Sequence, residues 1–130
     1  MKNLHLSYDD VLLVPKYSSI RSRSEIDVGA NLGKGVQLHL PIIASPMDTI
    51  SETTMANAMG GAGGTAIIHR YNTIERQAAI VSKVNQPCIV GAAIGIGGDY
   101  LERASALVAA GATYLCLDVA HGHHLSLIHI

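Results

Sequence analysis

The feature that most constrains the fold is a fourfold recurrence of continuous apolar segments, each about two dozen residues after the last. The segments are PIIASPM (41–47), GTAIIHR (64–70), CIVGAAIGI (88–96) and TYLCLDVAHG (113–122). Their apolar residues run together instead of alternating with polar ones, which is typical of strands covered on both faces. Strands separated by helix-length connections predict an α/β fold with a parallel sheet.

Helix signals occupy the stretches between these segments. The three predicted helices cover about 49–61, 72–86 and 99–112. Thr49 with Glu52, and Asn72 with Glu75, have the spacing of an N-terminal capping box. The first and third helices end at glycines and the second stops before Pro87, as helices commonly do. Strand and helix are therefore predicted to alternate.

The alternation fits two architectures, which the pattern alone leaves open. One is a complete doubly wound sheet of four strands, and the other is the first half of an eight-stranded βα barrel. In both, the chain forms a single domain with an arm at 1–39, strands and helices at 40–122 and an atypical tail at 123–130. Short strands are expected in the arm around 11–14 and 36–39.

Composition narrows the classes of function. Nine basic and ten acidic residues give a net charge of −1 without a run of either sign, so no nucleic acid partner is predicted. No apolar run approaches the ~20 residues of a membrane span, and the first residues are too polar for a signal peptide. Cys88 and Cys116 lie in apolar runs without a CxxC spacing and are expected to be buried, free thiols. We therefore expect a soluble, cytoplasmic protein.

Polar residues gather where the predicted strands end. The carboxyl ends of parallel strands form the ligand-binding edge in both architectures. Asp118 interrupts the buried pattern LCLDVA, so its carboxylate needs a partner, either a ligand group or a nearby arginine. His69 and Arg70 suit anion or carbonyl binding, with a solvated strand end as the equal alternative. Ser45 and Asp48 either bind a polar ligand or satisfy the backbone of a helix-entry turn.

Three further motifs give weaker signals. Met47 is either a core residue or a soft apolar surface for a flat ring. GIGGDY (95–100) lacks the third glycine of a dinucleotide fingerprint and favours a tight turn over a phosphate cradle. A histidine cluster near the end has no acidic ligand beside it, and no metal site is predicted there. Its members are His121, His123, His124 and His129.

Four motifs together resemble those of the IMP dehydrogenase / GMP reductase family. They are LSYDDVLLVPKYSSIRSRSEIDV, LPIIASPMDTISETTMANAM, GGTAIIHRYNTIERQ and LCLDVAHGH, in collinear order over about residues 4–123. The family fold implies that this chain is the first half of a TIM (β/α)8 barrel. Most IMP dehydrogenases insert CBS modules where SKVNQPCIVGAAIG here joins helix to strand directly. That join, with SRSEID and DVAHG, makes the chain most similar to GMP reductase.

The resemblance implies a purine nucleotide pocket and a cofactor segment. Ser45 and Met47 correspond to positions that line the pocket for GMP or IMP, the serine towards the sugar-phosphate and the methionine against the base. Asp118, Val119 and Ala120 correspond to the segment that contacts the nicotinamide-ribose side of NADPH.

Three more positions are assigned to the cofactor by the same resemblance. Ser22 and Arg23 correspond to arm residues that reach the cofactor of a neighbouring subunit. Arg70 lies where GMP reductases commonly have lysine. Family members are usually homotetramers of whole barrels, so a homotetramer is expected of the full-length protein.

The implied reaction is the reductive deamination of GMP to IMP and ammonia with NADPH, through a cysteine thiolate that attacks C2 of the purine. In the family, this cysteine and a potassium site follow the sixth strand, and the phosphate-binding loops come later. Cys88 and Cys116 match strand interiors, so no catalytic residue is predicted in this chain, which alone is expected to be inactive. The alternatives are an IMP dehydrogenase without CBS modules, which oxidises IMP to XMP with NAD, and a non-catalytic nucleotide-binding module.

Overall fold

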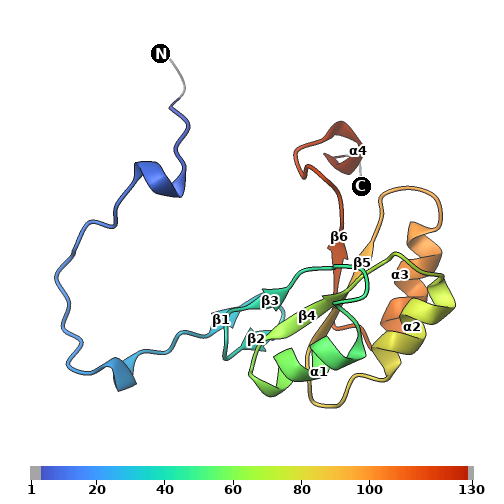
Figure 1. Cartoon of the computed structure of the whole chain (residues 1–130), viewed down its shortest axis with the longest axis horizontal. Helices are drawn as coiled ribbons and strands as arrows, with labels where there is room; N and C mark the ends of the chain where they lie inside the picture. Colours follow the sequence, from blue (N-terminus) through green and yellow to red (C-terminus); the bar gives the residue numbers. More distant parts are fainter. Residues whose placement is uncertain (1–3, 129–130) are drawn as a thin grey trace.

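The chain folds into a four-stranded parallel sheet with helices packed on one side and a long arm (Figure 1). The structure is a computed structural model and describes residues 4–128. The strands of the sheet are β3 (Ile43–Ala44), β4 (Thr65–Ile68), β5 (Val90–Ile94) and β6 (Tyr114–Leu117). The helices are α1 (Thr53–Gly61), α2 (Ile74–Ser82), α3 (Tyr100–Ala109) and α4 (Leu125–Ile128). The predicted alternation of strands and helices is confirmed.

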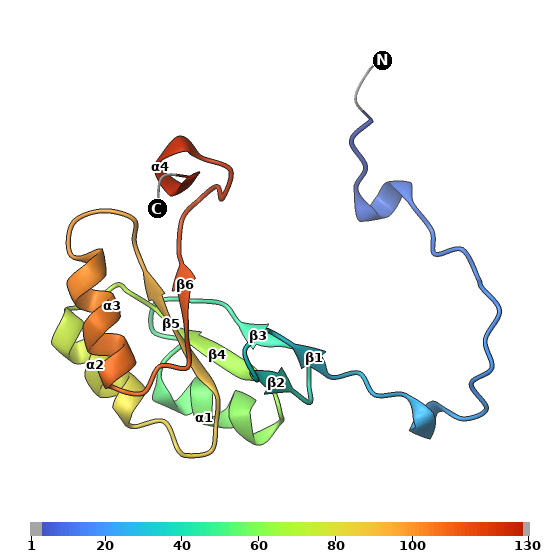
Figure 2. The ribbon, with the colours of Figure 1, turned by 180° about the vertical axis from the view of Figure 1, so that it is seen from behind.

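The strand order β3-β4-β5-β6 separates the two predicted architectures. Each strand pairs in parallel with the next in sequence, so that Gly91 of β5 lies opposite Ile67 of β4 and Tyr114 of β6. A doubly wound sheet reverses its strand order at a switch point and carries helices on both faces. Here the order does not reverse, and right-handed crossovers then place α1, α2 and α3 on one face, as Figures 1 and 2 show. This is the arrangement of part of a βα barrel.

The hydrophobic core lies between the sheet and these helices. Ile68 of β4 and Ala92 of β5 are fully buried, and they belong to one cluster with Val81 of α2 and Leu107 of α3. Every residue of β5 is buried, as expected for a central strand. The core therefore fixes the positions of β4 and β5, and the carboxyl end of β4 carries part of the candidate site.

The edge strands depart from the prediction of burial on both faces. Leu115 and Leu117 of β6 lie in register with buried Ala92 and Ile94 but are 37% and 39% exposed. Ile43 of β3, at the other edge, is 39% exposed. The prediction is wrong for these two strands, because burial on both faces requires a neighbouring strand and a covering helix.

Both predicted capping boxes are wrong. The N-cap of α1 is Glu52, and Thr49 lies in the turn before it with a φ of 60°. The N-cap of α2 is Thr73 and not Asn72, and the Thr73 hydroxyl accepts the backbone N–H of Arg76 at 3.3 Å. In each case the loop continues further before the helix starts, because its backbone first bonds to neighbouring elements.

The arm extends away from the sheet up to a small hairpin that lies beside β3 and joins the arm to the sheet (Figures 1 and 2). It contains the 3-10 turns η1 (Tyr8–Asp10) and η2 (Arg23–Glu25), and the hairpin pairs β1 (Ala30–Asn31) with β2 (Gln37–Leu38). The strand predicted around 36–39 is thus confirmed. The strand predicted around 11–14 is wrong: Leu12 and Leu13 are 95% and 98% exposed, and the segment has no strand to pair with.

Candidate functional site

The carboxyl ends of β4 and β6 bring Arg70 and Asp118 together. Arg70 Nε donates to Asp118 Oδ2 at 3.1 Å, and Nη2 donates to the Asp118 backbone carbonyl at 3.2 Å. The guanidinium crosses the end of β5 beside Gly95, where an added Cβ would lie 3.5 Å from Nη1. Of the two kinds of partner that the sequence left open for Asp118, the structure provides the arginine.

This ion pair leaves Asp118 equipped to bind a ligand. Two bonds from one planar guanidinium fix the orientation of the carboxylate and its backbone. The Asp118 side chain is 24% exposed and that of Arg70 is 37% exposed, so both are reachable from solvent. Because Oδ2 and the carbonyl face Arg70, Oδ1 is the oxygen that can accept hydrogen bonds from the hydroxyl groups of a bound molecule.

Val119 and Ala120 continue from Asp118 into a cavity of about 200 Å³. Its lining is completed by Ile96, His121, His124 and Leu127. The cavity is smaller than a cleft for a whole cofactor, and its mostly apolar walls suit a single flat ring. The predicted cofactor segment 118–120 therefore combines a carboxylate with an apolar hollow.

The residues Ser45-Pro46-Met47-Asp48, here called the SPMD turn, follow β3 directly. Ser45 is exposed, and Met47 is 52% exposed and therefore not a core residue. The Met47 carbonyl accepts the N–H groups of Ile50 and Ser51 at 3.3 and 3.0 Å, which closes the turn through its backbone. The side chains of Ser45 and Met47 are consequently available for a ligand.

His69 is buried, which contradicts the solvated strand end that the sequence allowed. It is 2% exposed, and its Nε2 lies 3.2 Å from Glu52 Oε1 and 3.9 Å from Asp48 Oδ1. Its neighbour Ser51 is fully buried as well. Sequence reasoning missed Ser51 and gave Glu52 only a capping role, because nothing in TISETT indicates that these residues bond to His69, which lies 18 and 17 residues later.

Ser22 and Arg23 do not join this group of residues. They lie at the turn η2 in the exposed arm, far along it from the sheet in both views (Figures 1 and 2). The Ser22 hydroxyl accepts the N–H of Ser24 at 3.3 Å and shares a hydrogen bond with its hydroxyl at 2.9 Å. The structure thus unites Arg70 with Asp118 and leaves the two arm residues apart from them.

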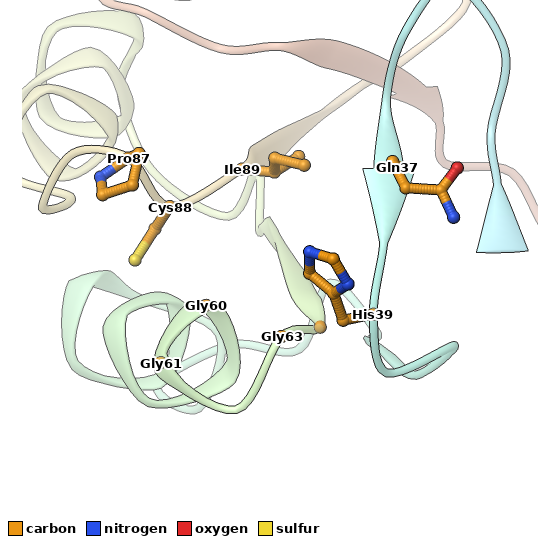
Figure 3. A pocket seen from close by; sticks show the side chains of 9 residues that line it. Gln37, His39, Gly60, Gly61, Gly63, Pro87, Cys88 and Ile89 are labelled. Atoms are coloured by element: carbon orange, nitrogen blue, oxygen red, sulfur yellow. The ribbon is translucent and has the colours of Figure 1, made fainter. Parts of the chain in front are cut away.

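Both cysteines are free thiols, as predicted, but they are half-buried instead of buried. Cys88 precedes β5 and lines a cavity of about 340 Å³ with Gln37, His39 and glycines at the end of α1 and before β4 (Figure 3). This is the end of the sheet opposite Arg70 and Asp118. Cys116 lies on β6, where burial and then the charge of Asp118 raise the pKa of its thiol. Raising this pKa reduces the nucleophilic thiolate at neutral pH.

Within residues 4–128, no group of three His, Cys, Asp or Glu side chains is placed to hold a metal ion. His121 and His123 pack edge to face with ring centroids 6.3 Å apart, and His129 of the same cluster lies outside the described residues. The same part of the chain contains no helix of the length and hydrophobicity needed to cross a membrane.

Comparison with known proteins identifies the relatives of this chain. Residues 5–130 match the family model described as "IMP dehydrogenase / GMP reductase domain". The chain belongs to the IMP dehydrogenase / GMP reductase family. The family fold is a βα barrel, in agreement with four consecutive parallel strands and helices on one face.

Individual relatives within the family carry both enzyme names. The inosine-5'-monophosphate dehydrogenase of Nitrosopumilus maritimus is 49% identical over 81 residues, which cover 62% of this chain and 17% of that protein. The GMP reductase of Leishmania donovani is 44% identical over 81 residues, which cover 62% of this chain and 16% of that protein. The inosine-5'-monophosphate dehydrogenase of Cryptosporidium parvum is 33% identical, with 95% of this chain and 41% of that protein covered.

The chain spans less than half the length of these relatives. The chain therefore belongs to a family of purine nucleotide oxidoreductases. Dehydrogenases and reductases of this family match the chain at comparable identity, so the match does not distinguish between the two reactions.

Proposed function

We propose that this chain carries nucleotide and cofactor contacts of a GMP reductase-like oxidoreductase. The reaction converts GMP, NADPH and a proton to IMP, ammonia and NADP⁺. The observation that carries the proposal is the Arg70–Asp118 ion pair at the carboxyl ends of β4 and β6, the edge at which barrel enzymes bind their ligands. The direct connection from α2 to β5, without an inserted module, favours the reductase.

The SPMD turn is proposed to bind the purine nucleotide. The exposed Ser45 hydroxyl both donates and accepts hydrogen bonds, which suits the sugar-phosphate. The half-exposed Met47 thioether offers a polarisable apolar surface to the flat purine base. Together they would hold the base against the inner side of the sheet with its reacting carbon towards the cofactor.

The residues after β6 fit a nicotinamide cofactor. Asp118 Oδ1 can accept the hydroxyls of a ribose, and the hollow beside Val119 and Ala120 suits a flat ring. When bound, the nicotinamide supplies the hydride. Arg70 holds the Asp118 carboxylate in one orientation, so the ribose meets a fixed acceptor.

Ser22 and Arg23 are proposed to act on the cofactor of a neighbouring subunit. The supporting observation is their place on an arm that extends away from its own sheet, where Arg23 is exposed (Figure 1). An arm of this kind contributes to a site only through assembly, so the proposed homotetramer and the arm contacts depend on each other.

An IMP dehydrogenase without CBS modules is the second candidate function. The relative from Nitrosopumilus maritimus, which is named a dehydrogenase and is 49% identical, favours it. This enzyme would oxidise IMP to XMP with NAD through the same SPMD turn and the same Asp118. The two candidates therefore differ in the cofactor and in the direction of hydride transfer, and not in the residues assigned here.

The 130 residues by themselves are proposed to bind without turnover. Cys88 lies at the wrong end of the sheet for a nucleophile, and Cys116 sits on a strand with a raised thiol pKa. Covalent attack on the purine requires an activated thiolate at the ligand edge. On its own, this chain is therefore proposed to act as a non-catalytic nucleotide-binding module.

Binding and absorbance assays test these proposals. We expect NADPH to bind the purified chain and Asp118→Ala to weaken that binding at least tenfold, whereas Asp27→Ala, in the arm, leaves it unchanged. Equal binding by all three proteins would refute the assigned role of Asp118.

Nicotinamide absorbance is then followed with GMP plus NADPH and with IMP plus NAD, where the 130-residue chain is expected to give no turnover. The same assay on a longer protein that contains these residues distinguishes reductase from dehydrogenase.

A further inference from the structure

His69 uses both ring nitrogens inside the protein. Its Nδ1 accepts the backbone N–H of Tyr71 at 3.2 Å, so the ring hydrogen is on Nε2. Nε2 then donates to Glu52 Oε1 at 3.2 Å, with Asp48 Oδ1 at 3.9 Å. A histidine that merely filled space in the core would not need hydrogen-bond partners on both ring nitrogens. The ring instead connects the end of β4 to the segment that follows β3.

Ser51 completes this connection through the backbone. The fully buried Ser51 hydroxyl donates to the Ser45 carbonyl, and the Ser51 N–H donates to the Met47 carbonyl at 3.0 Å. The Ser51 carbonyl in turn accepts the N–H of His69 at 3.4 Å. One buried serine therefore holds both sides of the SPMD turn and is itself held by His69.

Glu52 anchors the same contacts to the helices. It is the N-cap residue of α1, and its Oε1 lies 3.5 Å from Arg76 Nη2 of α2 as well as 3.2 Å from His69 Nε2. The charged groups around the imidazole are thus Asp48 and Glu52 before α1 and Arg76 on α2. Loss of the imidazole would release Glu52 to Arg76 alone and leave the backbone bond between His69 and Ser51 as the remaining link from the SPMD turn to the end of β4.

We propose that His69 is a positioning residue that holds the SPMD turn, and with it Ser45 and Met47, in the shape that binds a purine nucleotide. This inference rests on the proposed function and adds to it a residue that touches no ligand. The His69 side chain acts through Glu52 and its backbone N–H through Ser51, from a position one residue before Arg70. The nucleotide side and the cofactor side of the site therefore share one strand end.

Two conservative substitutions test the roles of the two ring nitrogens of His69 independently. In His69→Gln, the amide nitrogen takes the place of Nε2 and still donates to Glu52. In His69→Asn, the amide oxygen takes the place of Nδ1 and still accepts from Tyr71, while the contact with Glu52 is lost. His69→Ala removes both contacts, and His39→Ala, at an exposed histidine at the other end of the sheet, is the matched control.

The test is a titration of the full 130-residue chain and its variants with GMP, followed by amide NMR and by hydrogen exchange at Ser51. We expect His69→Ala and His69→Asn to bind GMP at least tenfold more weakly and to lose protection at Ser51. His69→Gln should stay within about threefold of the original chain, and His39→Ala should be unchanged. Amide signals of β5 report whether each variant is folded, and if His69→Ala unfolds, the Asn and Gln variants decide.

Wild-type affinity and Ser51 protection in His69→Asn would overturn the proposal. If the original chain binds no GMP, the proposed function of the SPMD turn fails, and the exchange data still answer the structural half. Loss of protection in His69→Asn but not in His69→Gln would then support positioning by Nε2, and protection in both would refute it.

Discussion

Replacing Gln77 by methionine is expected to destabilise the fold strongly, because this side chain joins three elements inside the core. Gln77 is fully buried on α2. Its Nε2 donates to the carbonyl of Ile68, the last residue of β4, at 3.2 Å and to that of Ala93 in β5 at 2.8 Å. Its Oε1 accepts from Arg103 Nη1 of α3 at 2.8 Å. Methionine keeps the length of the side chain and removes all three hydrogen bonds.

The magnitude follows from the kind of bond that is lost. Two neutral bonds to buried carbonyls contribute about 1 kcal/mol each, and the bond from the charged Arg103 contributes roughly 1.5 kcal/mol or more. Arg103 keeps Asp99 and the carbonyl of Asn72, so its charge is not left unpaired. The greater hydrophobicity of methionine offsets about 1 kcal/mol of the loss. We expect a net loss of about 2.5 kcal/mol or more, a large fraction of the ~5–15 kcal/mol that stabilises a typical domain.

Urea unfolding of the chain and its variants measures this loss. Gln77→Met should lower the midpoint without changing the slope, and Gln37→Met, at an exposed glutamine, should remain within about 0.5 kcal/mol of the original. A double-mutant cycle with Arg103→Met should show a coupling of about 1 kcal/mol between the two side chains. Equal midpoints for Gln77→Met and Gln37→Met would refute the reasoning, since the buried bonds would then contribute no net stability.

Two further predictions concern packing and pH. A methyl group at Gly91 would overlap the ring of Tyr114, so Gly91→Ala should lower the free energy of unfolding in urea by about 1–3 kcal/mol. In the double variant with Tyr114→Ala, the loss should be smaller than the sum of the two single losses, and additive losses would contradict the overlap. The hydrogen bond from Arg103 lowers the pKa of Asp99 below its ordinary 3.8. A lowered carboxyl pKa adds stability above the unfolded pKa that is lost as pH falls through the folded value. Unfolding midpoints at about pH 5 and pH 3 should therefore differ less in Asp99→Asn than in the original chain, and an equal or larger difference would contradict this assignment.

The residues alone were enough to predict the alternation of strands and helices and the family. Continuous apolar runs predict buried strands because a segment covered on both faces has no polar side to expose, and β4 and β5 meet that expectation. The sequence also placed Arg70 and Asp118 at strand ends and required a partner for the carboxylate. The edge strands and both helix caps were predicted less well, because burial and loop length depend on neighbours that a local pattern does not contain.

How these parts meet depends on the folded arrangement of the strands and helices. Arg70 and Asp118 are 48 residues apart in sequence, and they pair because the strand order places β4 and β6 on either side of β5. The same order, without a reversal, distinguished part of a barrel from a doubly wound sheet. The burial of His69 against Glu52 had no sequence signal at all. Periodicity reports which face of an element is apolar, whereas contacts between polar side chains depend on where distant elements lie after the chain has folded.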